Sequence, residues 1–298
     1  MISVRRLALL AALAALAGTG CATHLATLQT ARPVQRGKVQ VTGGTGAYLN
    51  VGPWVKVISE ASAEAEKVHK AIAAGEGYTL EPESQKRLLL AGIALAALAP
   101  GVSSELQVRT GVLPETLDVG VRVTGNSVRG DGRYRLFHAG EDGEGWLARQ
   151  SLDVSLGLGV TRHFFSNPLF TALKNISVDG FSRWDVDVPL SISAEYGRVF
   201  KVYGTARYLY SHTWMDPTVV EVGRQVAELT GTPGGVPAEV PMHYAGLTGG
   251  AAVGYGPLHL FFELTAGYTT CTPEIFGARQ ELGGLTFFPA VGLTFRTP

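Results

Sequence analysis

The chain has 298 residues, of which 46% are hydrophobic and 17% charged, and its formal net charge is zero. This balance argues against nucleic acid or an acidic surface as a partner. Glycine is over-represented, with 38 residues against a usual share of about 7%. A glycine-rich chain with few charges is typical of one large β-domain, including those that lie in membranes.

Residues 1–20 have the features of a signal peptide. Arg5 and Arg6 form a basic start, an apolar run follows, and small residues precede Cys21. The ending Gly-Thr-Gly-Cys resembles a bacterial lipobox, which implies that Cys21 is acylated and becomes the mature N-terminus. Ordinary signal cleavage near Cys21 is the alternative. The next stretch, residues 21–36, has no clear periodicity and is expected to be a periplasmic tether.

The clearest strand pattern covers residues 184–196. Apolar side chains occupy one parity from Trp184 to Tyr196 and polar ones occupy the other, so a strand here has one apolar and one polar face. An aromatic residue stands at each end of the apolar face. Twelve residue steps cover roughly 40 Å, and a tilt of about 45° projects them onto roughly 28 Å of bilayer. We therefore predict a transmembrane β-strand.

The same two-residue period recurs along the rest of residues 37–298 and gives about ten strands, an even number as in bacterial barrels. The predicted fold is all-β, an antiparallel transmembrane β-barrel. Residues 51–101 interrupt the pattern with helical spacing over 57–72 and 82–98, which predicts a helical insertion after the first strand. These helices are expected to pack as a buried hairpin, and a plug that partly fills the barrel mouth, or an interfacial helix, is the functional alternative.

Most long and short connections alternate along the chain, with two exceptions. The connection near Asn126 is short where an outer loop is expected, and residues 137–151 are long where a periplasmic turn is expected. Long connections face outward and short turns face the periplasm in outer-membrane barrels, so the rhythm places both termini in the periplasm. The long outer loop 212–241 is expected to contain a helix with Asp216 as its N-cap, Pro217 as its first residue and Gly231 at its end.

The polar parity of the strands should line the barrel interior, the lumen. It carries charges of both signs, which can pair across strands as a salt-bridged core or line a charged pore. The predicted lumen-lining residues are Asp118, Arg122, Arg129, Asp131, Arg133, Arg135, Asp153, Asp185, Asp187, Glu195, Lys201, Arg207 and Glu263.

Aromatic residues fall at the ends of the strands and predict two girdles at the membrane interfaces. The predicted girdle residues are Trp146, Phe164, Trp184, Tyr196, Phe200, Tyr208, Tyr210, Tyr255, Tyr268 and Phe295.

The lipobox-like signal, the short tether and an even set of alternating strands ending near Phe295 resemble Gram-negative outer-membrane β-barrel proteins that carry a lipoprotein-type signal peptide. The resemblance implies an outer-membrane location, with barrel-assembly and lipoprotein-processing machinery as partners. The chain has no Cys/His metal spacing and no nucleotide fingerprint, so no metal or cofactor is predicted.

We expect a non-enzymatic, lipid-anchored barrel that acts as a narrow porin-like channel or as a structural component. A soluble periplasmic lipoprotein with a β-sandwich or lipocalin-like barrel is the competing class. A third class is a surface protease, because Asp185 and Asp187 with His212 and Asp216 resemble the Asp pair and His-Asp pair of omptins.

Overall fold

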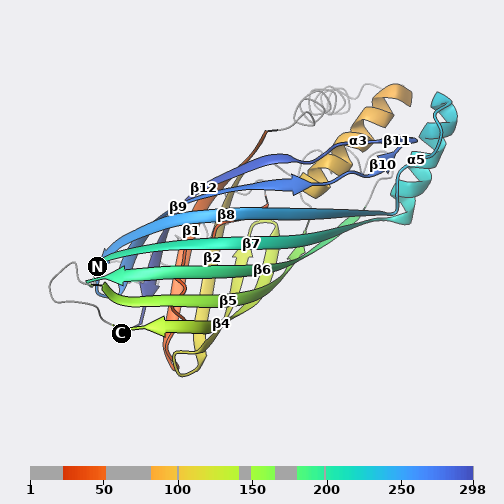
Figure 1. Ribbon diagram of the computed structural model, residues 1–298. Coiled ribbons are helices and arrows are strands. Elements are labelled where there is room, and N and C mark those ends of the chain that lie inside the picture. The colour runs from red at the N-terminus through yellow and green to blue at the C-terminus, as the bar shows by residue number, and fades with distance from the viewer. Residues whose placement is uncertain are drawn as a thin grey trace, which may run out of the picture.

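The structure is a computed structural model that describes residues 23–51, 82–98, 101–140, 149–164, 180–197 and 199–297. Ten antiparallel strands close into one barrel, in the order β1-β12-β9-β8-β7-β6-β5-β4-β3-β2 (Figure 1). The predicted ten-stranded antiparallel barrel is therefore confirmed. The strands are β1 (Val39–Val51), β2 (Gly101–Leu113), β3 (Leu117–Thr124), β4 (Ser127–Ala139), β5 (Arg149–His163), β6 (Phe181–Tyr196), β7 (Phe200–Met215), β8 (Glu239–Tyr255), β9 (Leu258–Thr270) and β12 (Gly284–Arg296).

Each barrel strand pairs with the next barrel strand along the chain, with β9 pairing with β12 across the separate hairpin at residues 274–279. β1 pairs with β12 to close the sheet, from Gln40 opposite Arg296 to Val51 opposite Leu285. The two ends of the barrel differ in their connections. The short-turn mouth carries tight turns such as those at Gly197 and Gly256, whose positive φ angles of 54° and 60° suit glycine. The long-loop mouth carries most of the longer connections, among them the one between β7 and β8. The two exceptions are the short connection from β3 to β4 at this mouth and the longer one from β4 to β5 at the other.

The outer face of the barrel is apolar and the inner face is polar. On β6 the side chains of Val188, Leu190 and Ile192 are 40–50% exposed, whereas Asp187 and Ser191 are buried. A water-soluble sandwich or lipocalin-like barrel would bury its apolar side chains instead. A closed sheet with this inverted pattern has the outside that lipid requires, so the soluble alternative is wrong.

Most of the predicted girdle residues lie on the outer face near strand ends. The half-buried ones are Tyr196, Phe200 and Tyr210, and the exposed ones are Phe164, Trp184, Tyr208, Tyr255, Tyr268 and Phe295. Trp146 lies outside the residues that the structure describes.

Two prolines, Pro189 and Pro289, lie inside transmembrane strands, where each removes a ladder donor. Strands β5 and β6 pair in the same register on both sides of Pro189, with Gly159 opposite Asp187 before it and Leu156 opposite Leu190 after it. The strands therefore pass Pro189 without a bulge. The register of β1 with β12 also continues unchanged past Pro289. The barrel accommodates both prolines by interrupting hydrogen bonds on one side of the strand, not by shifting it.

The long-loop mouth is covered by α3 (Pro82–Leu98), α5 (Pro217–Thr230) and the hairpin β10 (Glu274–Ile275) with β11 (Ala278–Arg279), which we call the cap (Figure 1). The helix predicted in loop 212–241 is α5, although β7 and β8 extend further and shorten the loop to 216–238. As predicted, the Asp216 carboxylate caps α5 by accepting from the Thr218 N–H, and Gly231 ends it in the left-handed conformation. These hydrogen bonds lower the pKa of Asp216.

The helix predicted at 82–98 is α3, and it packs against α5 and β7 at the mouth, not within the barrel. Its Leu89 and Ile93 belong to a buried cluster that also contains Val219 and Val226 of α5. The helix predicted at 57–72 lies outside the described residues. Neither described helix is long and apolar enough to cross a bilayer.

Residues 23–36 do not form a tether outside the barrel. They run through the lumen, where Leu25, Ala26 and Leu28 are at most 1% exposed. We call this stretch the luminal segment. An exposed tether would have left its apolar side chains and backbone groups in water, and here the barrel wall buries them instead.

An exposed leucine on the lipid face should be far more sensitive to charge than one on the cap. Leu264→Arg on β9, where the leucine lies at mid-strand and is 55% exposed, should destabilise the folded barrel in a bilayer by about 2–4 kcal/mol. Leu229→Arg on α5, where the leucine is 69% exposed, should change stability by less than about 0.5 kcal/mol. Urea unfolding in lipid vesicles measures both, and equal losses would contradict the lipid contact.

Candidate functional site: a lumen filled by the N-terminal segment

The luminal segment contacts the wall along its whole length. Near the long-loop mouth, Thr23 Oγ1 accepts from Arg183 Nη1 of β6 at 3.3 Å, and His24 Nδ1 lies 2.7 Å from Ser103 Oγ of β2. Near the short-turn mouth, the Val34 N–H donates to Asp118 Oδ2 of β3 at 2.8 Å. The segment therefore crosses the barrel from one mouth to the other.

Glu263 of β9 holds the middle of the segment. Its two carboxylate oxygens accept from the backbone N–H groups of Thr27 and Leu28, both at 2.7 Å, and Oε2 also accepts from the Tyr203 hydroxyl at 2.9 Å. Leu28 has a φ of 45°, an uncommon value for a residue with a side chain. Successive N–H groups that converge on one anion form the kind of concavity that backbone nests provide.

Three arginines of the wall donate to carbonyl oxygens of the segment. Arg207 Nη1 bonds Leu25 O at 2.6 Å and Arg122 Nη1 bonds Ala26 O at 2.7 Å. Arg133 donates to Thr30 O, near the short-turn mouth. Since an unpaired backbone carbonyl is costly when buried, these bonds make the segment compatible with a dry lumen.

Glycines on the inner face give the segment its room. A Cβ on Gly44 of β1 would stand 2.3 Å from Leu28 Cδ1, and a Cβ on Gly292 of β12 would stand 2.6 Å from the same atom. A Cβ on Gly111 of β2 would meet Val34 O at 2.3 Å. Any side chain at these positions would collide with the segment, so these glycines fit a permanently occupied lumen.

The charged side chains of the wall form a connected network. Arg109 bonds Asp118 Oδ1 at 2.6 Å and also pairs with Asp131. Arg129 of β4 pairs with Asp187 of β6 across the intervening strand β5. Buried ions need such partners because leaving water is costly for a charge.

The structure brings every predicted lumen-lining residue to the inner side of the barrel, as follows. Three of them are half-buried: Asp131, Arg135 and Lys201. The others are buried: Asp118, Arg122, Arg129, Arg133, Asp153, Asp185, Asp187, Glu195, Arg207 and Glu263. Lys201 Nζ lies 3.1 Å from Glu195 Oε1, and Arg135 Nη1 lies 3.8 Å from Asp153 Oδ1.

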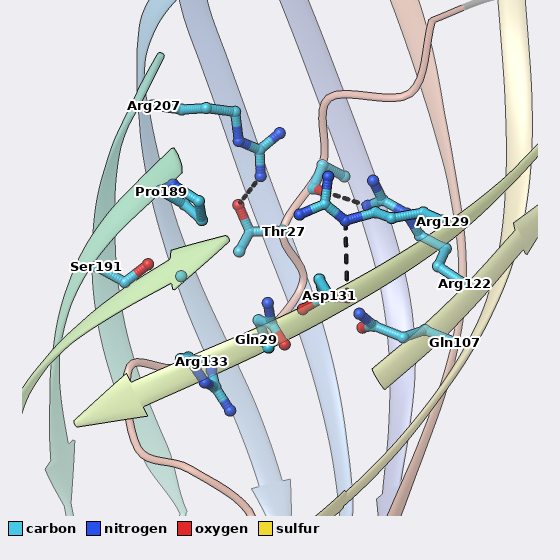
Figure 2. A pocket seen from close by; sticks show the side chains of 13 residues that line it. Thr27, Gln29, Gln107, Arg122, Arg129, Asp131, Arg133, Pro189, Ser191 and Arg207 are labelled. Carbon is cyan, nitrogen blue, oxygen red and sulfur yellow. Dashed lines mark hydrogen bonds and ion pairs between the residues drawn. The ribbon is translucent and has the colours of Figure 1, made fainter. Parts of the chain in front are cut away.

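Little space is left in the lumen. The cavity between the segment and the wall has a volume of about 10 Å³, roughly enough for one water molecule. Figure 2 shows Thr27 and Gln29 of the segment among Arg122, Arg133 and Arg207 of the wall. Among the described residues, this cavity offers no path for a solute.

The four residues that suggested an omptin-like site do not meet. Asp185 bonds His163 at 2.7 Å and Arg183 at 2.8 Å inside the barrel, and Asp187 belongs to the arginine network. His212 instead bonds the Tyr210 hydroxyl at 2.9 Å, and Asp216 caps α5. The arrangement gives these residues separate structural contacts.

One row of side chains resembles a nucleophile–base–acid arrangement. Ser103 Oγ lies 2.7 Å from His24 Nδ1, and His24 Nε2 lies 2.8 Å from Glu105 Oε2. Ser103 and Glu105 are each 1% exposed, and His24 belongs to the luminal segment, so the row is closed to a substrate. It fastens the start of the segment to β2.

Other reactive groups in the described stretches are sequestered as well. Cys271 is 1% exposed, and burial raises the pKa of its thiol to about 12, which keeps it protonated and unreactive. Within those stretches, no three His, Cys, Asp or Glu side chains are grouped so as to hold a metal ion.

Sequence analysis missed the luminal segment and some of its partners. Arg183, Ser193 and Tyr203 are inward-facing, yet they were not among the predicted lumen residues. Arg183 also supplies an inward base on β6, next to Asp185. The available signal was the run of small inward residues such as Gly44 and Gly292, which leaves lumen volume to be filled.

The sequence matches no protein-family model and no curated protein sequence. Among solved structures, the chain is similar to Neisserial surface protein A (10% identity, TM-score 0.31, covering 87% of this chain and 95% of that one). It is also similar to two proteins from Escherichia coli. For the outer membrane protease OmpT the identity is 7% and the TM-score 0.32, covering 88% of this chain and 97% of that one. For outer membrane phospholipase A the identity is 10% and the TM-score 0.28, covering 89% of this chain and 98% of that one. The fold assignment stands on the strand pairing of this chain.

Removing the carboxylate of Glu263 should loosen the luminal segment. Glu263→Ala leaves two buried N–H groups without an acceptor, at about 1–3 kcal/mol each, so the free energy of unfolding should fall by roughly 2–6 kcal/mol. Tyr203→Phe removes a single donor and should cost about 1–3 kcal/mol.

The exposed Glu281 provides the matched control, because Glu281→Ala should change stability by less than about 0.5 kcal/mol. Urea unfolding in vesicles measures all three variants. A loss for Glu263→Ala no larger than that of the control would show that the carboxylate does not hold the segment.

Proposed function

We propose that the protein is an outer-membrane barrel closed by its own luminal segment, and that it serves as a structural platform for the cap, not as an open channel. The observation that carries the proposal is the bonding of the segment's backbone by the wall, through Glu263 and Asp118 as acceptors and Arg122 and Arg207 as donors. A segment held by buried charged groups is part of the folded barrel.

The orientation follows from the connections. Short turns face the periplasm and long loops face the exterior in outer-membrane barrels. In this orientation the cap of α3, α5 and the β10–β11 hairpin is presented outside the cell. The cap is joined by contacts of its own, including Lys86 Nζ at 5.5 Å from the Phe276 ring centre, so it is a built surface and not a set of loose loops.

A channel would require the segment to leave. Its departure would strip the backbone partners from Glu263, Arg122 and Arg207 and leave their charges facing one another across an empty lumen. Such a lumen would admit water and ions, because fixed charges in a wide barrel favour a hydrated pore. The porin-like function therefore belongs to an unplugged form of the protein.

The lipid anchor at Cys21 is also part of the proposal, and it would involve lipoprotein-processing machinery as a partner alongside the barrel-assembly machinery. Cys21→Ala should abolish metabolic labelling of the protein with a palmitate analogue, because the thiol is the acylated group of a lipobox. The variant barrel should still insert, which retention of its heat-dependent mobility in SDS gels would check. Labelling that persists in Cys21→Ala would contradict acylation at this residue.

The closed lumen predicts electrical silence. The purified full chain in a planar bilayer should show no steady conductance, because the remaining cavity of about 10 Å³ passes no hydrated ion. Replacing residues 24–35 with a Gly/Ser stretch of equal length should open the barrel and give measurable conductance. In that opened barrel, Arg133→Glu or Asp187→Lys should change the cation/anion preference.

A locked variant provides the control for opening. Ala31 N lies 2.9 Å from Ser193 Oγ, so cysteines at these two positions should form a disulfide that keeps the segment in place. This variant should stay silent both before and after reduction, as the unmodified chain should, and conductance should appear only in the variant whose residues 24–35 are replaced. Steady conductance of the unmodified full chain, or of the locked variant before reduction, would reject the closed-barrel function.

A further inference from the structure

The luminal segment has a defined direction inside the barrel. Its first described residues, Thr23 and His24, contact Arg183 and Ser103, which are the third residues of β6 and β2 counted from the long-loop mouth. Its last residue, Arg36, forms a bridge to Gly111 near the other end of β2. The chain therefore runs from the long-loop mouth down to the short-turn mouth.

The bridge gives an independent check of this direction. Arg36 and Gly111 pair in parallel, so the segment runs in the same sense as β2, and β2 starts at the long-loop mouth. The chain then reverses at Gly37, which has a φ of 78°, and returns toward the long-loop mouth as β1. Both observations place Thr23 at the mouth that the cap covers.

We propose that the chain before Thr23 emerges at the long-loop mouth, so that Cys21 and the lipid it would carry are presented on the outer side of the membrane. The inference rests on the orientation given under the proposed function. It replaces the expectation of a periplasmic N-terminus, whereas Thr297 after β12 stays at the short-turn mouth.

Chain length and the space beside the described part of the segment favour this route. Two residue steps separate Cys21 from Thr23, a reach of about 7 Å, whereas strands of 13–17 residues form most of the barrel wall. A return through the lumen would need space, and the cavity beside the segment measures about 10 Å³. A return outside the barrel would expose unpaired backbone groups to lipid.

The arrangement makes the barrel a passage for its own N-terminus. The wall side chains that bond Ala26, Thr27 and Val34 hold the segment at successive depths, so Thr23 is held at the mouth beside the cap. A lipid at that end would insert into the membrane from the outer face, and would add a second attachment to the one the barrel provides.

Epitope accessibility in intact cells tests the proposal. A short tag inserted between Ala22 and Thr23 of the full chain should bind an impermeant antibody before permeabilisation. The same tag inserted between Gly256 and Pro257, in a short turn, should bind only after permeabilisation. Heat-dependent mobility in SDS gels selects the tagged proteins that have folded as barrels.

A smaller probe covers the case in which either tag prevents folding. In a Cys21→Ser, Cys271→Ser background, Ala22→Cys should react with an impermeant maleimide on intact cells, and Pro257→Cys should react only after lysis. Labelling of position 22 only after permeabilisation, or of position 257 on intact cells, would overturn the proposal. The closed-barrel function would then stand or fall separately, because bilayer conductance does not depend on sidedness.

Discussion

The structure depends on a mutual requirement between buried charges and a buried backbone. Among the described residues Glu263 forms no ion pair, and its carboxylate is satisfied by two N–H groups of the luminal segment and by Tyr203. The segment in turn would have orphaned polar groups without Glu263, Asp118 and the wall arginines. The charged wall side chains and the backbone of the luminal segment would each be costly to bury alone. Together they form a packed polar core inside an apolar shell.

Barrel width explains why such a segment is needed. About eight strands enclose an interior that side chains alone can fill, whereas this barrel has ten. The surplus space lies beside β1 and β12, whose inward glycines Gly44 and Gly292 would collide with Leu28 if they carried a Cβ. The long side chains of Arg122 on β3 and of Arg129 and Arg133 on β4 fill another part of the lumen. Strand number, glycine positions and the luminal segment therefore form one packing solution.

Much of the fold is predictable from the sequence because its signals are local. The two-residue period, the aromatic residues at strand ends and the cap of α5 at Asp216 each depend on neighbours in the chain. The luminal segment has no period, and its partners are distant, with a sequence separation of 84 for Val34 and Asp118 and of 236 for Thr27 and Glu263. No local pattern reveals such contacts, so the segment resembled a tether. The separation of Asp185 from His212 has a local cause, because the two residues face opposite sides of the paired strands β6 and β7.

Hydrogen exchange read by mass spectrometry tests the central claim most directly. The amides of Thr27, Leu28, Ala31 and Val34 donate to wall side chains, so a peptide covering residues 23–36 should exchange as slowly as the transmembrane strands in the folded protein. Exchange of this peptide as fast as in the unfolded chain, while the strands remain protected, would contradict a segment held within the barrel.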